Sequence, residues 1–264
     1  MDAWLALLIG ARRHDLPDFP PPCPVEHAKR FRSEDREARA WVVREGDRTV
    51  AAAELGLPLR DNLRADGAHL VVAPGRRRRG LGRSLWDGVV AQARLAGREH
   101  LCVEVHSPLD GSAPGSEFLR AAGARPALTD TRRVLDVRPG DPALSGSRPQ
   151  ARDAARGDGL VQWTGPTPEP WLDDLAALIA RMSTDAPLGE LALEPERWDA
   201  PRVRARDAAD AARGRRTIVT AARGPDGHLV GYTALASAPR SPGTRARTTR
   251  SSSPRTAATA SACG

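Results

Sequence analysis

The sequence has 264 residues, 40% of them hydrophobic, which is enough for one large or two small folded domains. All but one of the 40 basic residues are arginine, and the formal net charge is +7. Five arginines and no acid lie in residues 237–264, so the rest of the chain is nearly neutral, and only 4% of residues are aromatic. We therefore expect no nucleic-acid partner.

The N-terminal stretch 2–13 is apolar and predicts a first helix. An acid precedes it where a signal peptide has basic residues, and no apolar run in the sequence is long enough to span a membrane. Cys23, Cys102 and Cys263 have no metal-ligand spacing. We therefore expect a cytoplasmic protein with reduced thiols, no metal and no membrane contact.

Strands and helices alternate after the proline-rich stretch 16–24. A second helix is predicted at about 26–38, and residues 38–55 predict two strands joined by a turn at Gly46-Asp47. A further strand, ended by Pro74, precedes an amphipathic helix that begins near Leu81 and buries Leu85 and Val89, with Trp86, Val90 and Ala93 beside them. The stretch EHLCVEVHSP then predicts another strand, which completes a strand–helix–strand unit.

The loop of that unit, in VVAPGRRRRGLGRSL (71–85), combines four arginines with two glycines at the start of the helix. The N–H groups of a first helical turn lack intrahelical partners and attract anions. Gly80 and Gly82 have no Cβ and let a diphosphate approach the main chain. The alternative is a solvated run of charges, which is the usual role of an isolated arginine cluster.

Val72, Pro74, Arg77, Gly80 and Gly82 fit the pattern V-x-P followed by [RQ]-x-x-G-x-[GA]. Residues 1–138 thereby resemble the GNAT (Gcn5-related) N-acetyltransferases. The resemblance implies a mixed, mostly antiparallel sheet flanked by helices, an α/β fold, with acetyl-CoA as co-substrate. The family usually opens with a strand before its first helix, and we expect that strand to be missing from this sequence.

The same resemblance implies which residues hold acetyl-CoA. The strand before the loop pairs with pantetheine in that family, and the loop N–H groups hold the pyrophosphate. Carried over residue by residue, the binding set is Leu70, Val71, Val72, Arg77, Arg78, Arg79, Gly80, Leu81, Gly82 and Arg83.

Acetyl transfer to an amine needs a proton acceptor, for which Glu104 is the first candidate and His106 the second. Glu104 alternates with buried positions and resembles the base in the LEVR strand of ribosomal-protein N-acetyltransferases. Glu54 and His69 are weaker candidates, and an ordinary polar residue on a partly exposed face is the alternative for each. The family often carries a tyrosine acid four residues before a glycine. Here Leu119 precedes Gly123 in this way, and the sole tyrosine is Tyr232.

A short helix near 115–124 and a strand at 131–137 end the first domain, 1–138, and a linker is predicted at 139–157. Residues 158–237 predict a strand, two helices and a hairpin. The first helix begins near Thr167 (N-cap) and Pro168 and buries Trp171, Leu175, Leu178 and Met182. The segment beginning at Arg48 aligns with the segment beginning at His228 at an offset of 180 residues. The chain thus resembles tandem-GNAT proteins, with an N-terminal half as its second copy.

Residues 238–264 are of low complexity and predict a disordered tail. A second hypothesis is that they are a frameshifted reading of the second copy's acetyl-CoA loop. Shifted codons for residues 256–262 can encode H-R-G-H-R-L-G, and those for Ser251 to Ser253 always encode Leu, Ile, Val or Phe. On this hypothesis the second copy binds no CoA of its own.

The predicted function is acetyl-CoA-dependent transfer of an acetyl group to an amine of a small molecule or peptide. The alternative is a catalytically silent acyl-CoA-binding or regulatory module, favoured by the missing tyrosine acid. The sequence defines neither the acceptor amine nor the oligomeric state.

Overall fold

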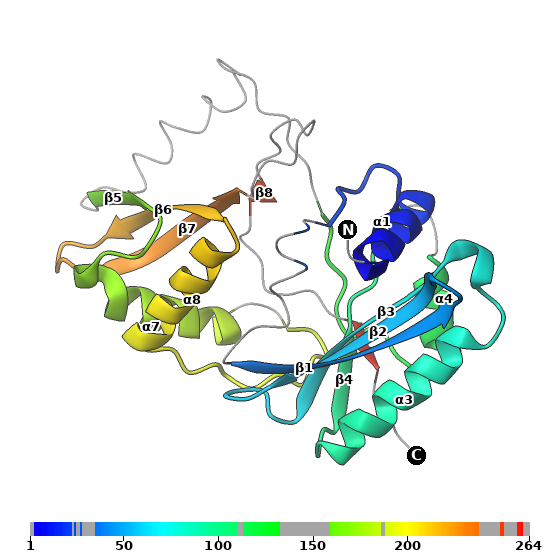
Figure 1. Cartoon of the computed structure of the whole chain (residues 1–264). Coiled ribbons are helices and arrows are strands. Elements are labelled where there is room, and N and C mark those ends of the chain that lie inside the picture. Colours follow the sequence, from blue (N-terminus) through cyan, green and yellow to red (C-terminus); the bar gives the residue numbers. More distant parts are fainter. Residues whose placement is uncertain are drawn as a thin grey trace. The chain divides into compact units, whose positions relative to one another are not determined.

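The computed structural model describes residues 3–22, 24, 27, 35–109, 113–132, 159–185, 188–237, 249–250 and 258–260 (Figure 1). The chain divides into two compact units. Unit 1 comprises residues 1–130, 187–196 and 255–264, and unit 2 comprises residues 131–186 and 197–254. Each unit has its own sheet and its own hydrophobic core.

Unit 1 is built on a five-stranded sheet in the order β1-β2-β3-β4-β9. Its strands are β1 (Arg36–Glu45), β2 (Arg48–Pro58), β3 (Ala65–Val72), β4 (His100–Val103) and β9 (Ala258–Ala260). All neighbouring strands are antiparallel except β3 and β4, which run parallel. The mixed, mostly antiparallel sheet expected from the sequence is therefore confirmed.

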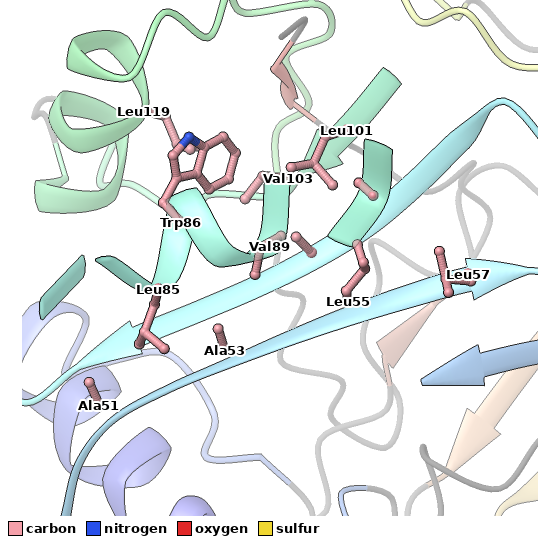
Figure 2. Close-up of a cluster of buried hydrophobic side chains, with 12 residues drawn as sticks. Ala51, Ala53, Leu55, Leu57, Leu85, Trp86, Val89, Leu101, Val103 and Leu119 are labelled. Carbon is pink, nitrogen blue, oxygen red and sulfur yellow. The ribbon is translucent and has the colours of Figure 1, made fainter. Parts of the chain in front are cut away.

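Helices cover both faces of this sheet. Helix α1 (Ala3–Asp15) contacts β2 and β3 on one face, where Trp4 and Leu7 pack on Ala52. Helix α3 (Leu81–Leu95) covers the other face, and α4 (Pro114–Ala121) adds Leu119 to the core there. Figure 2 shows Leu85 and Val89 of α3 facing alternate residues of β2, namely Ala51, Ala53, Leu55 and Leu57, while the Trp86 ring lies beside Leu119.

The predicted amphipathic face of α3 is confirmed. Leu85, Trp86, Val89 and Ala93 are buried, and Leu81 and Val90 pack at the edge of the cluster. Full burial of each large apolar side chain contributes about 1.5–3 kcal/mol, so this face anchors the helix on the sheet. The helix ends at Leu95 with Ala96 as its C-cap, and Gly97 follows with φ of +71°, the left-handed conformation that glycine adopts readily after a helix.

Unit 2 contains an antiparallel sheet in the order β5-β6-β7-β8. Its strands are β5 (Gly159–Thr164), β6 (Arg216–Arg223), β7 (Leu229–Ser237) and β8 (Thr249–Arg250). A 3₁₀ turn (Glu169–Trp171) leads into α7 (Leu172–Asp185), and α8 (Ala200–Ala212) follows. Leu172, Leu175, Ala176 and Val203 form the buried centre of this unit.

Three predicted helix boundaries are wrong. The helix expected at about 26–38 does not reach its predicted end, because Arg36 to Ala38 pair with β2 as part of β1. Thr167 is not the N-cap of α7, since its N–H donates to Asp207 (2.7 Å) and the α-helix begins only at Leu172. The second helix of residues 158–237, which the sequence pattern from Glu194 onward predicts, begins only at Ala200, where the Asp199 carboxylate accepts from the Arg202 N–H (2.8 Å).

The buried face of α7 also differs from the prediction. Leu172, Leu175 and Ala176 are buried, whereas Met182 is 41% exposed. Leu175 is buried as predicted, whereas Trp171 lies in the 3₁₀ turn outside the α-helix, so the buried face of the helix begins at Leu172.

Several predictions fall outside the described residues: the linker 139–157, the strand at 131–137 beyond Arg132, Cys23, Cys263, and all of 238–264 except 249–250 and 258–260. Residues 188–196 follow α7 in the sequence but belong to unit 1, where the Glu190 N–H donates to the Ala127 carbonyl (2.9 Å). In the described part of the chain, every helix is too short or too polar to cross a bilayer.

Candidate active site

Strands β3 and β4 separate in the middle of the sheet of unit 1. Their parallel pairing runs only from Ala65 with His100 to Ala68 with Val103. Strand β3 continues to Val72, which still pairs with Ala51 of β2 on its other side. Over His69 to Val72, β3 therefore has an edge that β4 does not cover, and an extended ligand can form backbone hydrogen bonds there.

β4 itself is shorter than predicted, because the strand ends at Val103 and does not continue through Glu104 to His106. The alternation of its side chains still holds up to that point. Leu101 and Val103 are 3% and 8% exposed in the core below α3, and Cys102 lies between them with an intermediate exposure. The end of β4 places Glu104 where the two parallel strands diverge.

The chain turns sharply between β3 and α3. A 3₁₀ turn (Pro74–Arg76) follows β3, then Arg78 has φ of +62° and Gly80, the N-cap of α3, has φ of +84°. The first helical hydrogen bond runs from the Ser84 N–H to the Gly80 carbonyl (3.0 Å). The N–H groups at the start of α3 thus have no helical acceptor, and they are those of Leu81, Gly82 and Arg83.

Gly82 lies between the end of β3 and helix α4. A Cβ added there would stand 3.5 Å from the Phe118 ring and 3.7 Å from the Val72 side chain, which is ordinary contact. At Gly80 the space is open, but its positive φ disfavours any side chain. The loop combines left-handed residues with a helix N-terminus, the arrangement in which backbone N–H groups form an anion-binding concavity.

The four arginines expected to hold phosphates are placed differently from one another. Arg77 forms a two-point ion pair with Asp15, with both N–O distances 2.7 Å. Arg83 donates to the Ala121 carbonyl (3.2 Å) at the end of α4. Arg78 and Arg79 are exposed, and no described residue forms a hydrogen bond or ion pair with either side chain. These two carry the charge that remains available to a ligand.

The α1 side of the sheet carries the candidate proton acceptors. His106 Nε2 lies 3.0 Å from Glu104 Oε1, with the two side chains 36% and 46% exposed. This hydrogen bond is the main cause that holds the pKa of Glu104 below its usual value, partial burial opposes it, and His69 and Arg12 lower the pKa further. Glu104 is therefore ionised at neutral pH and orients the imidazole of His106.

Residues from α1 and the segment after it complete this cluster. The Phe19 ring meets the His106 ring edge-on, with 4.4 Å between centroids, and the Arg12 guanidinium lies 4.9 Å from the centre of the Phe19 ring. Arg12 also donates to the Pro20 carbonyl (3.3 Å). No sequence pattern marks Arg12, Phe19 and Asp15 as site residues, because only the tertiary arrangement brings them there.

Glu54 and His69 face each other across β2 and β3. Glu54 is fully buried, and Arg36 Nη2 lies 3.7 Å from its Oε1. The Arg36 guanidinium lies directly over Gly56, where a Cβ would overlap it. Glu54 is thus enclosed by its own sheet and by Arg36. His69, in contrast, lowers the pKa of Glu104 through its charge.

The position at which the family often has a tyrosine acid is apolar. Leu119 is 6% exposed and belongs to the core between α3, α4 and the sheet. Tyr232 lies in unit 2, where burial raises its pKa and the charge of Arg206 partly offsets that effect. The apolar side chain of Leu119 therefore cannot protonate a leaving group at the end of β4.

Residues 8–113 match the sequence model of the acetyltransferase (GNAT) family. The chain is also similar to a tandem GNAT protein from the clavulanic acid biosynthesis pathway, with a TM-score of 0.66 and 27% identity, over 94% of this chain and 74% of that one.

Two further solved structures resemble single parts of the chain. A putative GNAT acetyltransferase from Desulfovibrio desulfuricans is 23% identical (TM-score 0.37; 51% of this chain, 82% of that one). The ribosomal-protein-S18-alanine N-acetyltransferase from Escherichia coli is 19% identical (TM-score 0.36; 48% and 74%). No curated protein matches the chain.

Residues 8–113 are therefore a GNAT acetyltransferase domain. The similarity to the tandem GNAT protein extends over 94% of the chain and therefore beyond this domain.

Proposed function

We propose that unit 1 transfers an acetyl group from acetyl-CoA to an amine of a small molecule or peptide. The observation that carries the proposal is the coincidence of three features at one end of the sheet. These are the uncovered edge of β3, the glycine-containing turn at the start of α3, and the Glu104–His106 pair where β4 ends.

The chain's own groups suit the parts of acyl-CoA. The edge from Leu70 to Val72 provides backbone donors and acceptors for the amide-containing pantetheine arm. The N–H groups of Leu81, Gly82 and Arg83 face a diphosphate, and Arg78 and Arg79 add positive charge. The role of Arg77 is different, because Asp15 occupies its guanidinium.

In the reaction the amine nitrogen attacks the thioester carbonyl, a C–N bond forms, the C–S bond breaks, and CoA leaves as a thiolate. The amine must also lose a proton. We assign this proton to the Glu104–His106 pair: the ionised carboxylate accepts a hydrogen bond from Nε2–H, and Nδ1 of the imidazole takes the proton. Phe19 packs against the ring and limits its rotation.

Thermal shift with acetyl-CoA tests the site. Acetyl-CoA should raise the melting temperature of the wild type, and Gly80→Leu or Gly82→Leu should abolish the increase, because a side chain fills the diphosphate position. Gly88→Leu is the matched control: Gly88 is exposed on the same helix with open space around it. An unchanged shift in both loop variants contradicts the assignment.

One observation favours a second candidate function. The burial of Leu119 leaves no side-chain acid at the position that often protonates the thiolate in this family. Unit 1 would then bind acyl-CoA without efficient turnover and act as a binding or regulatory module. Thiol release from acetyl-CoA, measured over a panel of amines, separates the two: binding with no release for any amine supports the module.

A further inference from the structure

We propose that Asp15 is a positioning residue for the diphosphate loop: it fixes Arg77, and Arg77 in turn sets the loop conformation that acyl-CoA requires. The inference rests on the proposed function, because it concerns the same loop. On this proposal Arg77 is not a phosphate ligand, and Asp15 of α1, which no sequence pattern marks, supports the diphosphate loop.

The geometry is that of a two-point carboxylate–guanidinium pair. Nη1 and Nη2 of Arg77 each lie 2.7 Å from a different oxygen of Asp15, and Nε donates to the Val72 carbonyl (3.2 Å). The two side chains are only 23% and 25% exposed. All three nitrogens of the guanidinium are thus used, and one side chain ties the end of α1 to the end of β3.

Asp15 is an unfavourable residue for its own helix. It is the last residue of α1, where the negative end of the helix dipole repels a carboxylate, and the other charged residues of that turn are basic. His14 Nδ1 lies 3.1 Å from the carboxylate, but this histidine is exposed. The contact that compensates for the position is the one with Arg77.

The pair acts on a strained segment. Arg78, the residue after Arg77, is not glycine, yet it has φ of +62°, a conformation that persists only when its neighbours enforce it. On one side Arg77 is held at three points, and on the other Gly80 caps α3. Release of Arg77 would let the loop that begins at Arg78 relax, and the N–H groups at the start of α3 would then no longer point toward one bound anion.

This role makes a prediction opposite to that of a phosphate ligand. If Arg77 bound phosphate and Asp15 merely competed for it, removal of Asp15 would free the guanidinium and strengthen CoA binding. If Asp15 positions the loop, its removal weakens CoA binding even though the local negative charge is gone. The sign of the change therefore separates the two roles.

The test is calorimetric titration of the full chain with CoA. Asp15→Ala should weaken binding about tenfold, the loss expected when a charge-assisted pair no longer presets the loop, and Asp15→Asn, which retains one acceptor oxygen, should weaken it less. Glu45→Gln is the matched control, since Glu45 pairs with Arg76 in the adjacent turn (2.7 Å) but its pair is more exposed. It should change the affinity by less than about twofold.

Hydrogen exchange without any ligand gives a second readout. Amides from Arg78 to Arg83 should exchange faster in Asp15→Ala than in the wild type, while those around Val89 in α3 remain protected, which excludes general unfolding. Equal or tighter CoA binding by Asp15→Ala, or unchanged loop exchange, overturns the inference. A wild type that binds no CoA overturns the proposed function instead, and the exchange measurement still tests the pair.

Discussion

The two units contain similar hairpins in different surroundings. At the offset of 180 residues, Arg36 of β1 corresponds to Arg216 of β6, and Leu55 of β2 to Leu235 of β7. From Val50 to Leu57, β2 is buried on both faces, between α1 and α3. Most described residues of β7 are partly exposed. The second strand of the hairpin is thus fully buried in unit 1 and only partly buried in unit 2.

The side chains at corresponding positions of β2 and β7 also differ. Ala51, Ala53 and Leu55 point at α3 in unit 1, and their counterparts at the offset are Gly231, Thr233 and Leu235. On the opposite face, the buried Glu54 corresponds to Ala234. The hairpin is therefore a shared scaffold that carries different side chains in the two units.

The largest expected effect is on the free energy of unfolding and comes from the different burial of β2 and β7. Leu55→Ala should lower the free energy of unfolding by about 2–5 kcal/mol, because it leaves a cavity in a fully enclosed site. Leu235→Ala should cost clearly less, since Leu235 is already partly exposed. Urea denaturation of both variants measures the difference. Equal losses would show that β7 is covered as completely as β2.

A smaller effect concerns the chemistry. Glu104→Gln should slow acetyl transfer at neutral pH by about 10²-fold, the usual contribution of a positioned acid–base group, and by less at high pH, where the amine deprotonates unaided. Because the pKa of Glu104 is lowered, the wild-type rate should stay independent of this carboxylate until the pH falls below its ordinary range near 4.5.

The pH–rate profiles of both enzymes test this role. Tyr232→Phe, a change in unit 2, is the control and should leave the rate unchanged. A Glu104→Gln profile that is parallel to the wild-type profile at every pH would exclude the Glu104–His106 pair from proton transfer, and a slow Tyr232→Phe variant would show that unit 2 takes part.

The smallest expected effect lies in the hairpin of unit 2. Asp174 of α7 accepts from His228 (2.9 Å) and from the Leu229 N–H (2.9 Å), and this contact raises the pKa of His228 above 6.5. A raised pKa in the folded state stabilises the protein below the unfolded pKa, and that contribution disappears as the pH rises through the folded value. His228 is exposed, so the stabilisation should be slight.

The titration of His228 can be followed by its imidazole resonances. Asp174→Asn should return the midpoint toward 6.5, whereas Asp226→Asn should lower it less, because Asp226 acts only through its charge on the ring. A midpoint that Asp174→Asn leaves unchanged would show that the contact between α7 and the hairpin does not hold in solution.

Local patterns in the sequence predicted the parts of the fold that depend on neighbouring residues. The helical face of Leu85 and Val89, the two hairpins and the turn at Gly80 all follow from periodicity and glycine placement. The end of the second helix was wrong, because pairing of Arg36 with Pro58 outweighs local helix preference.

The candidate site was only partly predictable for the same reason. Asp15 and Arg77 are 62 residues apart, and Phe19 reaches His106 from a proline-rich segment without any recognisable pattern. Such contacts depend on how α1 packs on the sheet, and the sequence does not define that geometry. Arg77 consequently received a phosphate-binding role from its place in a motif, although its guanidinium is occupied by Asp15.

The early end of the pairing between β3 and β4 has a consequence for ligand selectivity. The β3 edge from His69 to Val72 presents main-chain groups, which are the same for nearly every amino acid. These main-chain groups would recognise a bound acyl-CoA through the spacing of its amide groups, and the side chains of β3 would contribute little to this recognition. Substitutions among apolar residues on this edge would then be tolerated, while proline, which lacks the N–H donor, would not. Discrimination between acyl groups would have to arise further along, where Glu104, His106 and Phe19 surround the reacting end.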